Sequence, residues 1–304
     1  GVASVEALRQ ARELGDLAPW LVAASGSTAY QVQLAFPRGR PDLTLNSQLQ
    51  GVTLNLPEPL NKSAQAVWPL RLQSGPLERG DQPPHERLAL DLGSPTRPLA
   101  KLLLERDLTG PTPRLLRGHV QLGGVAGAPV LPASGMTAQV VLPALDVDAW
   151  EAWLQRSGQS GQMGTPNAQA YWPARLDLSV DRLTVAQRTL HSLRAQARRE
   201  GAVWRTELTA EELAGRIDYR MGEGAHGGQV FARLSHLKIE RSAASNVDQL
   251  LQQQPQSVPA LDVVVDRLEL GQRMLGRLAL EAVNRNTDSG NEWRLNRVEL
   301  EVPE

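Results

Sequence analysis

The chain has 304 residues, a net charge of −1 at pH 7 and no cysteine. The near-zero charge gives no electrostatic basis for binding nucleic acid or an anionic membrane surface, and the lack of cysteine excludes disulfides and thiolate chemistry. A composition of 41% hydrophobic and 21% charged residues is typical of a folded protein. Only two Phe and three Tyr occur, which favours an aliphatic apolar surface.

The N-terminal segment predicts a short amphipathic helix over 4–14, with Val5 and Leu8 on one side. No apolar run approaches the ~18–20 residues that a membrane span needs, since the stretch 18–24 already contains Pro19. The chain starts with Gly1 rather than Met, so we expect it to be a piece of a longer protein whose anchor lies elsewhere.

Alternating apolar and polar residues predict β-strands through most of the remaining chain. The first runs through Tyr30, Val32, Leu34 and Phe36, and Pro37 ends it. Further strands are predicted within 43–49, 52–56, 88–92, 116–122, 138–142, 217–221 and 230–234. Strand signals separated by Gly and Pro indicate a mainly β fold. Such strands, joined by a few short helices, either pack as two sheets face to face or form one curved sheet around an apolar trough.

Two helices are predicted between these strands. Residues 148–155 begin with Asp148 three positions before Glu151, as in a capping box, and carry Trp150 and Trp153. These tryptophans could plug the end of a groove, but a hydrophobic anchor for the helix is the simpler interpretation. Residues 246–253 have Asn246 as the expected N-cap, and low-complexity sequence is confined to 157–166 and 252–256.

An internal repeat is the most specific feature of the sequence. LDLSVDRLTVAQRTLHSLRAQA (176–197) aligns without a gap to LDVVVDRLELGQRMLGRLALEA (261–282), and half of the positions are identical. The apolar phase slips by one residue at Asp181-Arg182 and again at Asp266-Arg267, which predicts a β-bulge in each copy. Turns at Gln187-Arg188 and Gln272-Arg273 lead into second strands, so each copy reads as a hairpin and the copies as stacked units.

If the sheet forms a trough, the inward residues of each first strand are the predicted wall of this groove. They are Leu176, Leu178, Val180, Leu183 and Val185 in the first copy, and Leu261, Val263, Val265, Leu268 and Leu270 in the second. The alternative is that they fill an ordinary closed core. One-sided strands must bury their apolar face against something, either a second sheet or a ligand such as an acyl chain.

No residue pattern specific to a catalytic mechanism occurs in the sequence. The five histidines have no metal-ligand spacing, and GxSxG, P-loop and GxGxxG motifs are absent. Asp146 and Asp148 could suggest a cation site, but helix capping explains them more simply. We expect no enzyme activity, no metal and no cofactor; loss of a turnover on replacing His119 or Asp146 would contradict this expectation.

Six stretches together resemble the YhdP family of AsmA-like, TamB-related bacterial envelope proteins. They are GSTAYQVQLAFP (26–37), LNSQLQGVTLNLPEPLNKSAQAVWPLRL (45–72), LPALDVDAWEAWL (142–154), LAGRIDYR (213–220), GGQVFARLSHLKI (227–239) and VPALDVVVDRLELGQRMLGRLALEA (258–282). The resemblance implies the periplasmic portion of a protein anchored in the inner membrane by segments outside this chain. On this basis we predict a mainly β fold, an extended, strongly curved antiparallel sheet that forms a repeating β-groove with a few short helices. The resemblance also implies that this groove carries phospholipid between the inner and outer membranes and supports the outer-membrane permeability barrier.

A structural or assembly scaffold that binds envelope proteins without carrying lipid remains the alternative function. In that case the exposed strand edges, or the DRL triplets at 181–183 and 266–268, would make the contacts. For the domain organisation we predict an N-terminal helical segment (1–27), a first β-groove portion (28–142), a helix and loop insertion (143–170), and tandem β repeats (171–304) whose copies start near 173 and 259.

Overall fold

The computed structural model describes residues 1–10, 21–77, 85–94, 96–110, 113–156, 170–222, 228–239, 259–287 and 290–302. Strands make up 68% of these residues, and the described part contains two α-helices. The seventeen strands belong to a mixed sheet that is not closed. The prediction of a mainly β fold with few short helices is therefore confirmed. The predicted helix over 246–253 and both low-complexity loops, 157–166 and 252–256, lie outside the described residues.

The chain divides into two compact units. The N-terminal unit comprises Gly1–Ala174 with Leu183–Gln187, and the C-terminal unit comprises Arg175–Arg182 with Arg188–Glu304. The N-terminal unit contains β1 (Val2–Ser4), β2 (Ala24–Ala35), β3 (Asp42–Ser47), β4 (Val52–Leu54), β5 (Leu70–Leu77), β6 (His85–Ser94), β7 (Arg97–Asp107), β8 (Arg114–Gly123) and β9 (Gly135–Asp146). It also contains α1 (Val5–Arg9) and α2 (Val147–Arg156).

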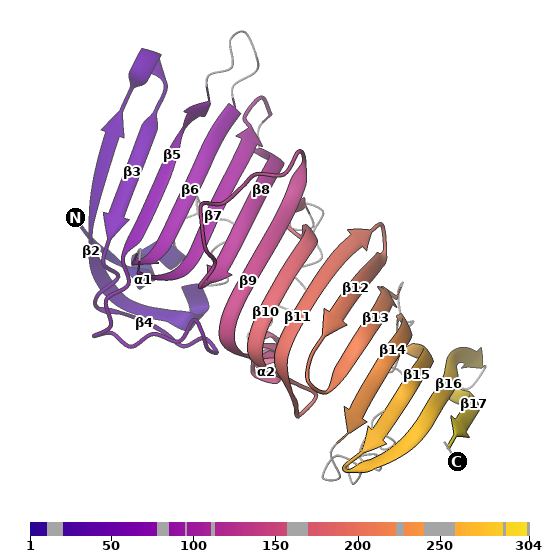
Figure 1. Ribbon diagram of the computed structural model, residues 1–304. Helices are drawn as coiled ribbons and strands as arrows, with labels where there is room; N and C mark the ends of the chain where they lie inside the picture. Colours follow the sequence, from indigo (N-terminus) through magenta and orange to yellow (C-terminus); the bar gives the residue numbers. More distant parts are fainter. Residues whose placement is uncertain are drawn as a thin grey trace. The chain divides into compact units, whose positions relative to one another are not determined.

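In the N-terminal unit, β2, β3, β5, β6, β7 and β8 follow one another as antiparallel neighbours (Figure 1). β9 then pairs with β8 in the parallel direction. The short strands β1 and β4 pair with β2 near its start. Pro76 lies in the part of β5 that pairs with β6 but extends beyond its pairing with β3, a partly unpaired position of the kind where Pro occurs in sheets.

The C-terminal unit contains most of β10 (Pro173–Val185), followed by β11 (Arg188–Glu200), β12 (Val203–Thr209), β13 (Leu213–Arg220), β14 (Gln229–Ile239), β15 (Ala260–Leu270), β16 (Arg273–Thr287) and β17 (Gly290–Glu301). β11 to β14 are successive antiparallel neighbours, β14 and β15 are parallel, and β15 to β17 are again antiparallel (Figure 1).

The two parallel pairs correct the expectation of a purely antiparallel sheet. Residues 124–134 carry the chain from the end of β8 back to the start of β9, so β9 runs in the same direction as β8. A tight hairpin would instead have made β9 antiparallel to β8. Strand alternation is the same in either direction, so it could not reveal this step.

The repeated hairpins are present, and their turns lie one residue earlier than predicted. The turn residues are Ala186-Gln187 and Gly271-Gln272. The β15–β16 register shifts between Val265 and Leu268, which confirms the predicted bulge at Asp266-Arg267. In the first copy, Val180 and Leu183 are buried while Asp181 and Arg182 between them are exposed, the same burial pattern as in the second copy.

Both helices differ in detail from their predictions. Helix α1 is only one turn long, with the Ser4 hydroxyl accepting from the Ala7 amide as its cap. Helix α2 is capped by Asp146, whose carboxylate accepts the Ala149 amide at 2.9 Å, rather than by Asp148. The prediction placed the cap two residues too late because both aspartates precede the same apolar run.

Candidate functional site: two apolar sheet faces

The N-terminal unit has a continuous apolar face. Residues directly opposite each other in a β-ladder project to the same side of the sheet. The ladder registers place one apolar residue from each of seven strands in a single row, namely Val32, Leu45, Leu72, Leu90, Leu102, Val120 and Ala138. Rows on either side continue the face, for example through Leu70, Leu92 and Leu122. We call this surface the first apolar face.

The first apolar face is most open at β2 and at Phe36, the residue directly after it. Val32, Leu34 and Phe36 are 46%, 54% and 62% exposed. Leu104 and Met136, on strands further along the same face, are buried. Large aliphatic side chains aligned across several strands and left accessible at one edge form a surface suited to non-directional apolar contact.

The opposite side of these strands is polar. Gln31, Asn46, Arg71, Asp91 and Lys101 occupy one row there. Glu105, also on this side, is 2% exposed and accepts bonds from Arg87 (2.9 Å) and Arg117 (2.6 Å). A carboxylate so deeply buried requires charged partners, and the two guanidinium groups provide them.

One charged row interrupts the first apolar face at its end. Glu86 lies two residues before Leu88 and directly opposite Arg106, which follows Leu104 by two, so both project to the apolar side. The Arg106 Nε donates to Glu86 Oε2 at 3.0 Å, and the Ser74 hydroxyl donates to Glu86 Oε1. The side chains of Arg106 and Glu86 are 22% and 14% exposed. This group was not among the predicted site residues, although charged residues at apolar positions of alternating strands are a signal of it in the sequence.

The C-terminal unit has its own apolar face, which we call the second apolar face. Its ladder registers align Leu208, Leu234, Val265, Leu278 and Leu300 in one row, with Gly215 between Leu208 and Leu234. A neighbouring row includes Ile217, Ala232, Val263, Leu280 and Val298. Ala232, Leu234, Val265 and Leu268 form the buried centre of the face, whereas Leu295, Val298 and Leu300 of β17 are about half exposed.

The predicted wall residues of the second copy are brought together on this face. Leu261, Val263 and Val265 occupy successive same-side positions of β15, and Leu268 joins the same buried cluster after the bulge. Leu270 lies opposite Ile239. Val265 is 0% exposed, so other side chains already cover it.

In the first copy, Val180 matches Val265 in burial, being 1% exposed. Leu183 is buried, Leu176 and Leu178 are half-buried, and Val185 is exposed. Whether these ten residues contact a lipid stays a prediction. The accessible parts of both apolar faces are instead at β2 and β17, which the prediction did not include.

Helix α2 is anchored to the N-terminal unit through its tryptophans. Trp153 is buried in a cluster with Ala23 and Leu56, and its ring meets that of Trp150 edge to face, with centroids 6.0 Å apart. The Trp150 indole donates to the Glu58 carbonyl at 3.0 Å. These contacts account for both side chains as an anchor; their action as a groove plug stays a prediction.

Asp148 of α2 holds the turn between β10 and β11. Its two carboxylate oxygens each accept a backbone amide, from Ala186 and Gln187, at 2.7 Å. Ala186 and Gln187 have φ angles of 49° and 59°, in the left-handed region, which residues other than Gly adopt at a cost in conformational energy. The carboxylate therefore stabilises a turn conformation that the sequence alone would disfavour.

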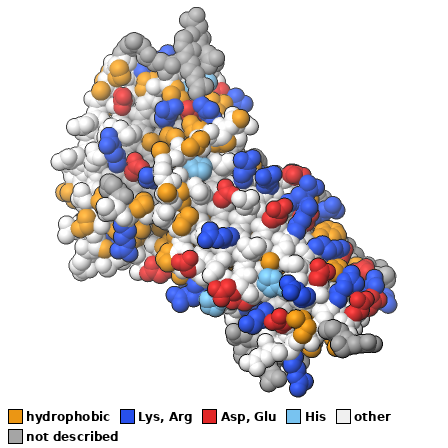
Figure 2. All heavy atoms as spheres, in the orientation of Figure 1, with side chains coloured by type: hydrophobic (Ala, Val, Ile, Leu, Met, Phe, Trp, Pro, Cys, Tyr) orange, Lys and Arg blue, Asp and Glu red, His pale blue; other side chains and the backbone are white. Residues whose placement is uncertain are grey.

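The polar side of the C-terminal unit carries ion pairs, one between β14 and β15 and one within β13. Arg233 pairs with Asp262 at 2.8 Å and Arg216 with Asp218 at 2.9 Å. Hydrogen bonds to these carboxylates raise the pKa of both arginines further. Over β11 to β17, one face of this unit shows positive and negative side chains interspersed (Figure 2), as expected for a solvated surface.

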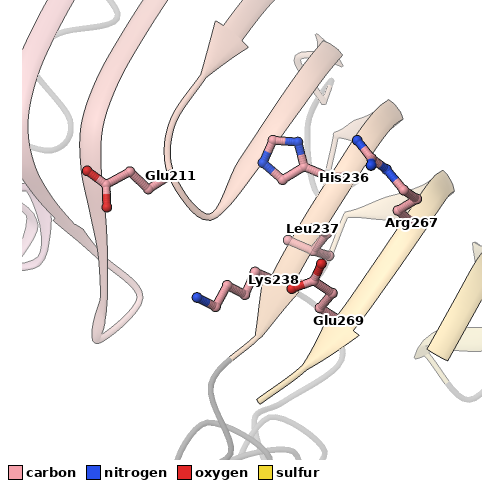
Figure 3. Close-up of a pocket in the computed structure, with 6 residues that line it drawn as sticks. All are labelled: Glu211, His236, Leu237, Lys238, Arg267 and Glu269. Atoms are coloured by element: carbon pink, nitrogen blue, oxygen red, sulfur yellow. The ribbon is translucent and has the colours of Figure 1, made fainter. Parts of the chain in front are cut away.

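A cavity of about 350 Å³ lies on the C-terminal unit. Strand β14 contributes His236, Leu237 and Lys238, strand β15 contributes Arg267 and Glu269, and Glu211 comes from the turn before β13 (Figure 3). Two cations and two carboxylates line it, so it favours neither sign of charge.

His191, Glu211 and Glu212 are the group within the described residues whose ligand atoms lie close enough to hold a metal ion. Glu212 already accepts both the backbone amide and the Nδ1 of His191, at 2.8 and 2.6 Å. The hydrogen bond to Glu212 raises the pKa of His191. Ser192 donates to Glu211 at 2.9 Å. The group is accounted for as a hydrogen-bonded ion pair joining β11 to the turn before β13.

The residues weighed for catalysis have structural partners. His119 Nδ1 lies 2.7 Å from the Thr137 hydroxyl, and Asp146 caps α2. That the chain is not an enzyme stays a prediction.

The sequence matches the YhdP family, described as YhdP protein, over residues 1–304. The chain belongs to the YhdP family. This is a family of the bacterial envelope, so membership agrees with the resemblance drawn from the six sequence stretches. No curated protein and no solved structure matches the chain. Among the described residues, no helix combines the length and apolar character that crossing a bilayer requires.

Proposed function

We propose that this chain is the periplasmic portion of an inner-membrane protein of the bacterial envelope, and that its apolar faces carry phospholipid acyl chains between the inner and outer membranes. The wider protein, anchored by segments outside this chain, would thereby support the outer-membrane permeability barrier. Family membership supports the setting, and the two apolar faces support the cargo.

The observation that carries the proposal is the alignment of apolar side chains across successive strands in each unit. In the N-terminal unit the row from Val32 to Ala138 crosses seven strands, which at ~4.8 Å per spacing is about 29 Å. An acyl chain fills half of a hydrocarbon core ~30 Å thick, or about 15 Å. One such row is therefore long enough to contact a whole chain.

Acyl chains suit this surface energetically. Burial contributes ~0.8 kcal/mol per CH₂, so two tails of ~16 carbons gain on the order of 20 kcal/mol from full burial, similar to what a bilayer gives them. Movement between membrane and protein would then be nearly neutral in free energy, as transport requires.

The first test is lipid content. Protein purified from bacterial cells should yield phospholipid on solvent extraction and mass spectrometry, and its absence would contradict the proposal.

Variants sharpen this test. Leu34→Asp on β2 and Leu300→Asp on β17 should each lower bound lipid severalfold with the fold retained, because both side chains are exposed on the apolar faces. The matched control is Gln33→Asp, which places the same charge on the same strand but on the opposite side. Equal losses in Leu34→Asp and Gln33→Asp would argue against a lipid-binding face.

A scaffold that binds envelope proteins is the second candidate. It is favoured by one observation: the bulge residues Asp181-Arg182 and Asp266-Arg267 are exposed in both copies. Arg182→Glu with Arg267→Glu should abolish function under this hypothesis, while Leu34→Asp and Leu300→Asp should be harmless. The lipid hypothesis predicts the opposite pattern.

A further inference from the structure

We infer that Glu86, Arg106 and Ser74 form a headgroup site that selects zwitterionic phospholipids, those with a phosphate and an ammonium group and no net charge. This inference rests on the proposed function, because it assigns the headgroup end of the same acyl-binding surface. The ion pair lies on the apolar side of β6 and β7, one row beyond Leu88 and Leu104.

The position of the pair is unusual for a structural ion pair. On the same two strands, the Arg87–Glu105 pair lies one residue along and projects to the polar side, where charge is expected. Glu86–Arg106 instead ends rows of leucine on the apolar side. A phospholipid has this same arrangement, in which apolar chains end at a charged group.

Arg106 retains unused hydrogen-bonding capacity. A guanidinium has five N–H donors, and the Nε and one Nη2 donor bond to Glu86. Among the described residues no acceptor contacts its Nη1 group. Two parallel N–H donors held in place by a carboxylate are well suited to a phosphate oxygen.

Glu86 supplies the selectivity. Its carboxylate lies within one hydrogen bond of the guanidinium, so a phosphate bound to Arg106 must lie close to this negative charge. A headgroup with a net negative charge meets repulsion there, whereas an ammonium group on the headgroup can donate to Glu86. Opposite charges in a partly buried site favour the zwitterion over the anion. Ser74 orients the carboxylate through its hydroxyl.

In the experiment, the protein is incubated with vesicles that contain equal amounts of phosphatidylethanolamine and phosphatidylglycerol. The protein is re-isolated, and both bound lipids are quantified by mass spectrometry. Wild-type protein should bind the two in a ratio about two- to fivefold above that of the vesicles, the range expected of partly exposed charge contacts. Glu86→Gln and the double variant Glu86→Gln/Arg106→Gln should bring the ratio back to that of the vesicles, with total bound lipid nearly unchanged.

The matched control is Glu105→Gln, which removes the neighbouring buried carboxylate on the opposite side and should leave the ratio unchanged. A wild-type ratio equal to that of the vesicles would overturn the inference even if no variant folded. An unchanged ratio in Glu86→Gln, or an equal change in Glu105→Gln, would also overturn it while leaving lipid binding intact. Absence of any bound lipid in the wild type would instead reject the proposed function.

Discussion

The two copies of the repeated hairpin bury the same valine but form their turns differently. Val180 and Val265 are 1% and 0% exposed, the most completely buried large side chains of the described residues. At the turn, the first copy has Ala186 and Gln187, both left-handed and both bonded to Asp148. The second copy has Gly271 in the left-handed position, and its amide donates to the Ile239 carbonyl.

The difference shows two solutions to one backbone requirement. Gly adopts positive φ without a Cβ penalty, so the second turn needs no carboxylate to offset that penalty. The first turn has no Gly, and a carboxylate from a helix 38 residues earlier in the chain stabilises it instead. Because Asp148 of α2 stabilises the first turn, that turn forms without a glycine.

The largest expected effect tests whether the two copies are equivalent in their cores. Val180→Asp and Val265→Asp should each destabilise the protein by at least ~3 kcal/mol, because each buries a carboxylate among aliphatic side chains. Urea unfolding followed by circular dichroism measures the loss. Val185→Asp, at an exposed position on the same strand as Val180, should change the free energy of unfolding by less than ~0.5 kcal/mol. A large loss in only one copy would show that the copies are not equivalent.

An intermediate effect is expected at the first turn. Asp148→Ala should cost ~1–3 kcal/mol, because two turn amides lose their acceptor. It should also speed hydrogen exchange of the Ala186 and Gln187 amides while leaving the second turn unchanged.

Two further variants identify the cause. Ala186→Gly should restore about 1 kcal/mol in the Asp148→Ala background, because Gly removes the left-handed penalty. Asp146→Ala removes only the helix cap and should cost ~1 kcal/mol without affecting exchange at the turn. Unaltered exchange in Asp148→Ala would refute the role given to this carboxylate.

The smallest effect depends on pH and on the first copy alone, since Gly276 occupies the position equivalent to His191. Glu212 raises the pKa of His191, so the pair stabilises the fold fully below the ordinary histidine value of 6.5 and loses this contribution as pH rises through the raised pKa. The pKa of Glu212 is lowered, so acidification from its ordinary value of 4.5 removes the contribution as well.

The difference in Tm between wild type and His191→Gln should therefore be largest between these limits and shrink on either side. Added salt should reduce it, because both groups are near the surface. A difference that does not vary with pH would mean that the pair contributes no charge interaction to stability.

Sequence alternation predicted the strands where one side is strictly apolar, as in Tyr30 to Phe36, and the phase slip predicted the bulge at Asp266-Arg267. It failed at β7, because Leu102, Leu103 and Leu104 are consecutive and Leu103 projects to the polar side opposite His119. It also failed at β5, where Gly75 and Pro76 resemble a turn.

Long-range partners set the limit for the candidate site. The pairing of Asp148 with Ala186 and Gln187 joins segments with no local pattern in common, so only the fold reveals it. Likewise, each strand showed which residues face inward, but the rows that run from β2 to β9 require the ladder registers. The exposed ends of the apolar faces at β2 and β17 follow from the strand order, which alternation does not encode.

The parallel pairing of β14 with β15 has a consequence for the repeat itself. β10 and β15, the first strands of the two copies, are five steps apart, and five successive reversals would make them run in opposite directions. One step without reversal leaves four, so both copies run the same way. The bulge and the turn of the hairpin therefore have the same polarity in both copies, so one alternation pattern serves both positions in the sheet.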